Sequence, residues 1–184
     1  FENISRSGIA AITLDEGDVL VEVQHTGGKH EVLIGTKTGL SIRFPEADVR
    51  SMGRSAAGVR GIRLEVEDQV VGLEVFPPNA KFTLLTVCEN GYGKRTDVSE
   101  YRGQHRGGGG VITIKATDRN GAVLGIKLVT DSDDLMIMTE QGKAIRLHCK
   151  DIKTISRNTQ GVRLVRLEEG DKIARVAPIA IEPP

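Results

Sequence analysis

The sequence predicts an all-β fold, a β-pinwheel or propeller-like disc of four-stranded blades that repeat about every 51 residues. Three observations predict it: a glycine-led apolar segment that recurs along the chain, a hairpin motif that recurs with the same period, and weak helical periodicity throughout. A unit of this length with several short strands cannot bury its apolar face alone, so it must stack on copies of itself.

The first recurring element is a short apolar strand that begins with glycine, as in Gly110-Val111-Ile112-Thr113-Ile114. Its four copies begin 50, 52 and 51 residues apart, at Gly8, Gly58, Gly110 and Gly161. We expect a strand after each of these opening glycines, over residues 8–12, 58–62, 110–114 and 161–165. We place the repeats of this single domain, residues 1–184, at approximately 1–49, 50–101, 102–152 and 153–184, the last of them partial.

The second recurring element is a hairpin, in which an apolar strand runs into a polar pair that ends in glycine and then into an alternating strand. Its copies occupy residues 32–43, 84–95 and 135–146, with turn glycines at Gly39, Gly91 and Gly142. Asn90-Gly91 is a strong hairpin signal, because glycine tolerates positive φ. A third shared strand is predicted at 19–23, 70–73, 123–126 and 173–176.

The number of copies bears on closure of the disc. The fourth copy ends after its second strand, at Pro184. Because three and a half copies do not readily close a ring, we expect the chain to be an incomplete piece of a larger disc, or its termini to pair. Kelch and WD40 repeats have a similar length but depend on signature tryptophans, and this sequence has no tryptophan.

Composition limits the possible functions. The chain has 25 basic and 25 acidic residues, so its net charge is zero and bulk attraction to nucleic acid cannot be argued. Any such attraction must come from segregated charge. The two cysteines, Cys88 and Cys149, are predicted to be reduced, part-buried thiols. No apolar run has the length of a membrane helix and no signal peptide is evident, so we expect a soluble cytoplasmic protein.

Basic residues recur in three series that keep the repeat period. In a ring of blades, equivalent positions point to equivalent places, so each series is expected to form an arc of positive charge on the rim, with acidic residues gathered at one turn. The alternative is that duplication has merely copied solvated charges. The three series are Arg43, Arg95 and Arg146, four residues after the hairpin glycines; Arg63, Lys115 and Arg166, five after the opening glycines; and Arg54, Arg106 and Arg157, four before them.

A curved row of cations suits duplex DNA, because it can follow the phosphate backbone without contacting the bases. If all nine matched cations met phosphates, the log–log salt slope of binding would be about −8. Only six aromatic residues exist, at positions that do not match between repeats, which disfavours base stacking on single strands.

Three longer segments carry a family resemblance. Residues 52–64, 90–96 and 156–167, with Met52-Gly53-Arg54 and Asn90-Gly91-Tyr92 among them, resemble the C-terminal domain of the A subunit of bacterial DNA gyrase. The resemblance implies a β-pinwheel whose basic rim wraps duplex DNA with positive handedness, so that strand passage by the rest of the enzyme introduces negative supercoils. It also implies partnership with the remainder of gyrase A and with gyrase B, and no catalytic activity in this domain alone.

One segment resembles a family motif only in part. Gln104-His105-Arg106-Gly107-Gly108-Gly109-Gly110 is similar to the family's glutamine, basic, arginine, glycine, glycine, basic, glycine box, with His105 and Gly109 in place of two strong cations. In the family the box belongs to the first blade. This segment is therefore either a degenerate copy that touches DNA or a glycine-rich connector between blades. By resemblance, the predicted DNA-binding set also includes Lys94, Gln104, His105 and Arg106.

Other chemistry finds little support. Each glycine-lysine pair lacks the serine or threonine of a phosphate-binding P-loop, and no serine or cysteine lies in a nucleophile motif. His25, His30 and Glu31 are the nearest approach to a metal site, and a solvated loop explains them better. We expect no cofactor, no metal and no catalytic residue. The alternatives that remain are the topoisomerase IV counterpart of the gyrase domain, a propeller-type protein-interaction scaffold, and an enzyme with its site in a central channel.

Overall fold

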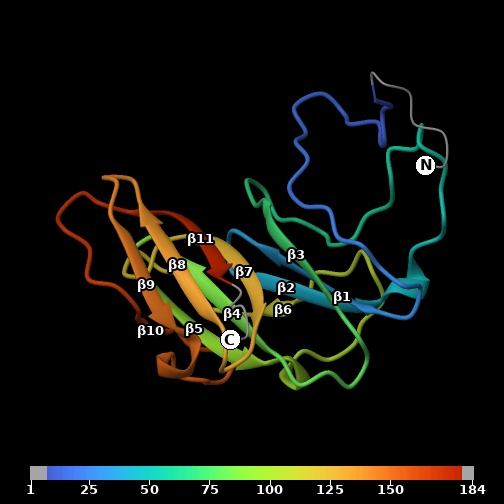
Figure 1. Cartoon of the computed structure of the whole chain (residues 1–184). Helices are drawn as coiled ribbons and strands as arrows, with labels where there is room; N and C mark the ends of the chain where they lie inside the picture. The colour runs from blue at the N-terminus through green and yellow to red at the C-terminus, as the bar shows by residue number, and fades with distance from the viewer. Residues whose placement is uncertain (1–7, 180–184) are drawn as a thin grey trace.

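A computed structural model of the chain describes residues 8–179, which are almost entirely β (Figure 1). Within these residues the strands form three antiparallel sheets, joined by three short 3₁₀ helices, η1 (Glu46–Asp48), η2 (Val98–Glu100) and η3 (Cys149–Asp151). The predicted all-β class is confirmed. None of the helices in the described part is long and apolar enough to cross a bilayer.

The three sheets have related strand orders. The first has the order β3-β1-β2-β6, from β1 (Glu31–Thr36), β2 (Leu40–Pro45), β3 (Val70–Phe76) and β6 (Val111–Ile112). The second has the order β10-β5-β4-β7, from β4 (Thr83–Cys88), β5 (Tyr92–Asp97), β7 (Val123–Val129) and β10 (Val162–Arg163). The third has the order β11-β8-β9, from β8 (Asp134–Thr139), β9 (Ala144–His148) and β11 (Ile173–Ile179).

All three predicted hairpins are confirmed, as β1–β2, β4–β5 and β8–β9. Their turn glycines have positive φ, at +92° for Gly39, +84° for Gly91 and +86° for Gly142. This conformation costs glycine little because it has no Cβ. The predicted strands at 70–73, 123–126 and 173–176 are also present, within β3, β7 and β11.

Each hairpin is completed by strands from later repeats. One side of the hairpin pairs with a strand of the next repeat, as in the pairs Leu33 with Glu74 and Leu85 with Lys127. In the first two sheets the other side pairs with a strand of the repeat after that, since β6 adds to β2 and β10 adds to β5. A repeat is therefore not a blade, because one sheet combines segments of three repeats.

Three of the expected strands are absent from the structure: residues 8–12, 19–23 and 58–62 form no strand. The pairing rule of the other repeats explains this, because these segments would join hairpins one or two repeats earlier, and residues 8–179 contain no such hairpin. The consequence is large apolar exposure, 77% for Val19 and 75% for Val23, and the blue segment of Figure 1 runs away from the sheets. The expected strands after Gly110 and Gly161 are present but short, as β6 and β10.

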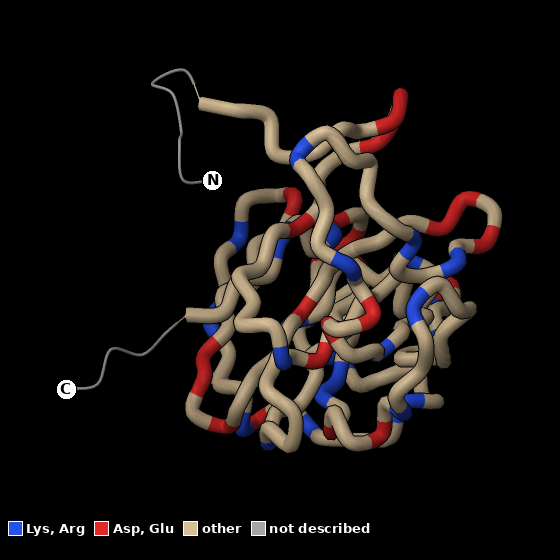
Figure 2. The backbone as a smooth tube through the Cα atoms, turned by 90° about the vertical axis from the view of Figure 1, so that its right-hand side faces the viewer, with Lys and Arg blue, Asp and Glu red and all other residues tan. Residues whose placement is uncertain are grey.

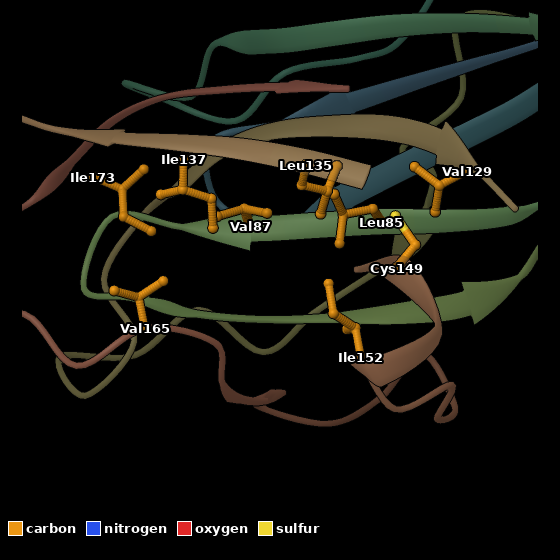
Figure 3. Close-up of a cluster of buried hydrophobic side chains, with 9 residues drawn as sticks. All are labelled: Leu85, Val87, Val129, Leu135, Ile137, Cys149, Ile152, Val165 and Ile173. Atoms are coloured by element: carbon orange, nitrogen blue, oxygen red, sulfur yellow. The ribbon is translucent and has the colours of Figure 1, made fainter. Parts of the chain in front are cut away.

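The largest core cluster lies where the second and third sheets meet, and Figure 3 shows its side chains facing one another. Its nine buried members are Leu85, Val87, Val129, Leu135, Ile137, Cys149, Ile152, Val165 and Ile173. Both cysteines are free and buried, and burial raises the pKa of the Cys88 thiol to about 12 and that of Cys149 to about 11. These thiols therefore remain protonated and behave as small apolar groups.

The turn glycines provide a matched test of strand exchange. An alanine Cβ at Gly91 would lie 2.6 Å from the Val165 carbonyl oxygen, which belongs to a later repeat, whereas nothing in the described part lies within 4 Å of one at Gly142. We expect Gly142→Ala to cost about 1 kcal/mol of unfolding free energy, because a side chain is strained at positive φ. We expect Gly91→Ala to cost about 1–3 kcal/mol more, because of crowding. Urea unfolding followed by circular dichroism measures both, and equal losses would contradict the close packing of the two repeats.

Candidate nucleic-acid interface

The arginines that follow the hairpin glycines lie partly inside the protein. Arg43 Nε donates to Glu31 Oε2 at 3.0 Å, and its Nη1 donates to the Val98 and Tyr101 carbonyls, both at 3.2 Å. Arg95 is 4% exposed, its Nε donates to Thr83 Oγ1 at 2.8 Å, and its Nη1 donates to the Cys149 carbonyl at 2.8 Å. The prediction that these two lie on an open rim is wrong.

The hairpin register gives the physical reason. Position four after the turn glycine lies opposite the preceding strand, as in the pairs Leu33 with Arg43 and Leu85 with Arg95. The side chain then reaches a residue twelve positions back and carbonyls in or beside a 3₁₀ helix of the next repeat. Arg146 follows the first part of this pattern, because its Nε donates to Asp134 Oδ2 at 2.6 Å, but its side chain remains 57% exposed.

Lys94, which the resemblance placed among the DNA-binding residues, is fully buried, so its side chain is not available to contact DNA. Its ammonium donates to the Ser156 carbonyl at 2.6 Å, to the Arg157 carbonyl and to Thr159 Oγ1 at 3.2 Å. Burial lowers the pKa of Lys94 to about 8. The three acceptors hold the protonated amine at neutral pH, and the cation ties β5 to the last repeat.

The arginines that precede the opening glycines make the same type of hydrogen bond to the preceding repeat in all three cases. Arg54 Nη1 donates to the Ala10 carbonyl at 3.3 Å, Arg106 Nη1 donates to the Arg60 carbonyl at 3.1 Å, and Arg157 Nη1 donates to the Ile112 carbonyl at 2.8 Å. In all three the acceptor lies two residues after the opening glycine of the preceding repeat. This series therefore joins successive repeats, although Arg106 and Arg157 keep part of their surface exposed.

The cations that follow the opening glycines by five residues are on the surface, as the predicted rim requires. Arg63, Lys115 and Arg166 are exposed, and their side chains form no hydrogen bond or ion pair with residues 8–179. Two of the main chains are anchored, because the Arg63 amide donates to the Gly108 carbonyl and the Lys115 amide donates to that of Thr159, both at 2.8 Å. Contact of these cations with DNA stays a prediction.

The structure adds a fourth series that we did not predict. Arg50, Arg102 and Lys153 lie eight residues before the opening glycines, and all three are exposed. Their side chains make no ion pair or hydrogen bond within the described ranges. The repeat period alone could have found them, since the three positions are 52 and 51 residues apart.

The glycine-rich segment from Gln104 to Gly110 packs against earlier repeats. The Gln104 amide donates to the Arg43 carbonyl at 2.8 Å, and the Gly107 amide donates to that of Gly61 at 2.6 Å. The Gln104 Nε2 atom is buried and has no partner among the described residues, so this amide is not presented to a ligand. The His105 side chain is fully exposed, with Nδ1 at 3.5 Å from Asp48 Oδ2. This geometry supports the connector interpretation, and His105 remains available for contact.

Acidic residues do not form one separate edge. Asp68 and Asp171, which are among the acidic residues expected to gather at one turn, are only 7% and 6% exposed. Each accepts a hydrogen bond from a hairpin-turn amide, Thr38 at 2.9 Å for Asp68 and Gln141 at 3.1 Å for Asp171. In Figure 2 red segments mark the tips of several turns, and blue segments are spread over several sides of the molecule.

Among residues 8–179, no group of three or more histidine, cysteine, aspartate or glutamate side chains is arranged to hold a metal ion. His30 Nδ1 accepts a hydrogen bond from the Gly27 amide at 3.0 Å and lies 3.6 Å from Glu46 Oε2, so this histidine has structural partners in its loop.

Known proteins share both the sequence and the fold of this chain. The family model described as "DNA gyrase C-terminal domain, beta-propeller" matches residues 1–26, 30–77, 83–130 and 133–180. The A subunit of DNA gyrase from Haloquadratum walsbyi (strain DSM 16790 / HBSQ001) is 46% identical over 96% of this chain and 21% of the relative. Its counterpart from Staphylococcus aureus (strain MRSA252) is 47% identical over 97% of this chain and 20% of the relative. The chain thus spans about a fifth of the length of these relatives.

Solved structures confirm the propeller-type fold. A DNA gyrase A C-terminal domain has a TM-score of 0.85 and 25% identity, over 95% of this chain and 59% of the other. The C-terminal domain of a DNA topoisomerase IV has a TM-score of 0.87 and 24% identity, over 94% of this chain and 53% of the other. The second likeness concerns the fold alone.

Replacing one buried and one exposed arginine tests the difference between the internal and the exposed cations. We expect Arg95→Ala to lower the unfolding free energy by about 2–3 kcal/mol, because it leaves the Cys149 carbonyl without its charged donor. Arg166→Ala should change it by less than about 0.5 kcal/mol, since that side chain is exposed and makes no tie within residues 8–179. Urea unfolding of both variants measures the difference. Equal stabilities would mean that Arg95 does not join the repeats.

Proposed function

Because the chain belongs to the DNA gyrase C-terminal domain family, we propose that it binds duplex DNA along its exposed cations and bends it. The observation that carries the proposal is a pair of exposed cation series in phase with the repeats. These are Arg50, Arg102 and Lys153, and Arg63, Lys115 and Arg166.

The chemistry of these side chains fits phosphates rather than bases. Exposed lysine and arginine side chains neutralise backbone charge and release counterions, independently of sequence. Such contacts position the duplex without specifying its sequence, and preference then comes from how easily the DNA bends. The two tyrosines of the chain are 7% and 1% exposed, so neither offers a stacking platform for single strands.

The proposal extends to the role of the domain in a larger enzyme. It would act as a non-catalytic module of an ATP-dependent type IIA topoisomerase in the cytoplasm, with the remainder of gyrase A and with gyrase B as partners. A positive wrap would present DNA so that strand passage introduces negative supercoils. The identities of 46% and 47% to gyrase relatives support this assignment over the topoisomerase IV alternative. A protein-interaction scaffold is the competing function.

Salt dependence tests the binding surface. If the six exposed series cations meet phosphates, the log–log slope of duplex affinity against salt should be about −5. Replacing Arg63, Lys115 and Arg166 together by glutamine should reduce its magnitude by about 3. Fluorescence anisotropy with a labelled linear duplex measures both.

The matched control removes the same charge elsewhere. Lys29, Lys37 and Lys81 are exposed and lie outside both series, so their triple glutamine variant should keep the wild-type slope. Equal effects of the two triple variants would reject the assigned surface. A wild-type chain that ignores DNA at moderate salt would favour the scaffold.

Religation of nicked circles tests bending and handedness. With the domain bound at saturating concentration, closure by ligase should fix a positive change in linking number, because a positive wrap stores positive writhe. The control is ligation with the Arg63, Lys115 and Arg166 glutamine variant at the same concentration. Topoisomers with unchanged linking number, despite tight binding, would contradict wrapping but not binding.

A further inference from the structure

A second type of cation cluster lies where three segments meet around Tyr92. Tyr92 begins β5, directly after its hairpin turn, and pairs in register with Arg163 of β10, which runs beside β5 in Figure 1. Arg163 Nη2 donates to the Tyr92 hydroxyl at 2.9 Å, and its guanidinium carbon lies 5.4 Å from the ring centroid. The Arg119 guanidinium carbon lies 4.9 Å from the same centroid.

Two positive charges thus share one tyrosine ring. Both arginines are exposed, and neither forms an ion pair with a carboxylate of residues 8–179. The pKa of Tyr92 is lowered, mainly by the hydrogen bond from Arg163 and then by Arg119, so both guanidiniums act on the phenol oxygen. Each guanidinium carbon lies within 5.4 Å of the same ring centroid, so the two positive charges repel each other, and an anion in contact with both would relieve that repulsion.

The surrounding structure fixes the arginines in place. Asn120 Nδ2, next to Arg119 in the chain, donates to the Lys115 carbonyl at 2.9 Å and to the Gln160 carbonyl at 3.0 Å. Arg119 itself reaches Gln160 Oε1 at 3.5 Å. The ring supplies a cation–π surface for each guanidinium. A ligand would therefore meet side chains that have already lost much of their freedom.

Duplication does not explain this cluster. The positions equivalent to Tyr92 hold Leu40 and Lys143, and those equivalent to Arg119 in the second and fourth repeats hold Glu67 and Gly170. The combination of one tyrosine and two arginines occurs once in the repeats, where the second, third and fourth meet. It is therefore a local feature, distinct from the periodic cations.

We propose that Arg119, Tyr92 and Arg163 form a binding site for one phosphate group of a nucleic-acid backbone. The site rests on the proposed DNA binding for the source of its ligand, but its chemistry is that of any phosphate anion. Guanidiniums offer paired donors that match phosphate oxygens, and the Tyr92 hydroxyl, which accepts from Arg163, retains its own proton to donate. The site would anchor the duplex where the second, third and fourth repeats meet.

The two tyrosines of the chain make the site observable. Burial raises the pKa of Tyr101 to about 12, whereas that of Tyr92 is lowered, so the first phenol ionisation belongs to Tyr92. Cations favour the phenolate, and a bound anion should cancel their effect. Absorbance titration at the phenolate band should therefore show the pKa of Tyr92 rising toward that of an ordinary tyrosine when inorganic phosphate or a short duplex is added. The Tyr92→Phe variant assigns this ionisation to Tyr92, because the first ionisation should disappear from its titration curve.

Charge-matched variants test the contribution to duplex binding. Arg119→Gln with Arg163→Gln should weaken duplex affinity at least tenfold and reduce the magnitude of the salt slope by about 1, because the site holds one phosphate. The control is Arg60→Gln with Arg175→Gln, two exposed arginines without an ion pair in the described part. Tyr92→Leu, which introduces the residue of the first hairpin, should also weaken binding, because the guanidiniums lose their platform.

The outcomes separate this site from the proposed function. If the wild-type chain binds duplex but the Arg119 and Arg163 pair behaves as its control, and phosphate leaves Tyr92 unchanged, the site is overturned while DNA binding stands. If the chain ignores duplex yet phosphate raises the pKa of Tyr92, the site stands with free phosphate as its ligand and DNA binding fails. If duplex still raises the pKa of Tyr92 in the Arg119 and Arg163 double variant, the shift comes from the overall negative charge of bound DNA, and the site is rejected.

Discussion

The structure depends on one constraint: no hairpin closes its sheet with strands of its own repeat. β1–β2 and β4–β5 each gain one strand from the next repeat and another from the repeat beyond it. Stability is therefore shared between repeats, because unfolding any of the last three repeats removes strands from at least two sheets. Residues 19–23 would join a hairpin one repeat before β1–β2, which the described residues do not contain, and they form no strand although their sequence is as apolar as that of β7.

This constraint decides what a repeated cation does. At the position four after a hairpin glycine, the register directs Arg43 and Arg95 toward carbonyls of the next repeat, and the charge becomes an internal tie. The position five after an opening glycine lies outside every strand, and Arg63 is exposed to solvent there. Periodicity in the sequence shows that a position matters to every repeat. It does not distinguish a tie between repeats from a contact with a ligand.

The elements that sequence could predict are those defined by local chemistry. Asn90-Gly91 and the alternating strands around it specify a hairpin whatever lies nearby, and the propeller-type fold followed from their period. The opening strands depend on partners distant in the chain, so the same glycine-led pattern gives β6 at Val111 but no strand after Gly58. The sequence likewise did not reveal the burial of Lys94, because its hydrogen-bond acceptors lie 62 to 65 residues further along the chain. The repeat period could also have identified the exposed cations Arg50, Arg102 and Lys153, which we did not predict.

The internal ties also determine where a ligand can be held rigidly. Residues 155–160 receive bonds from three sources: Thr96 Oγ1 to the Ile155 carbonyl at 2.8 Å, Lys94 to the Ser156 carbonyl, and Asn120 to that of Gln160. This junction is thus joined to two earlier repeats at once. Cations placed beside such a segment bind an anion with little further loss of freedom, whereas cations on the free ends of long side chains lose more. Buried cations that cannot touch a ligand would in this way raise the affinity of the exposed ones that can.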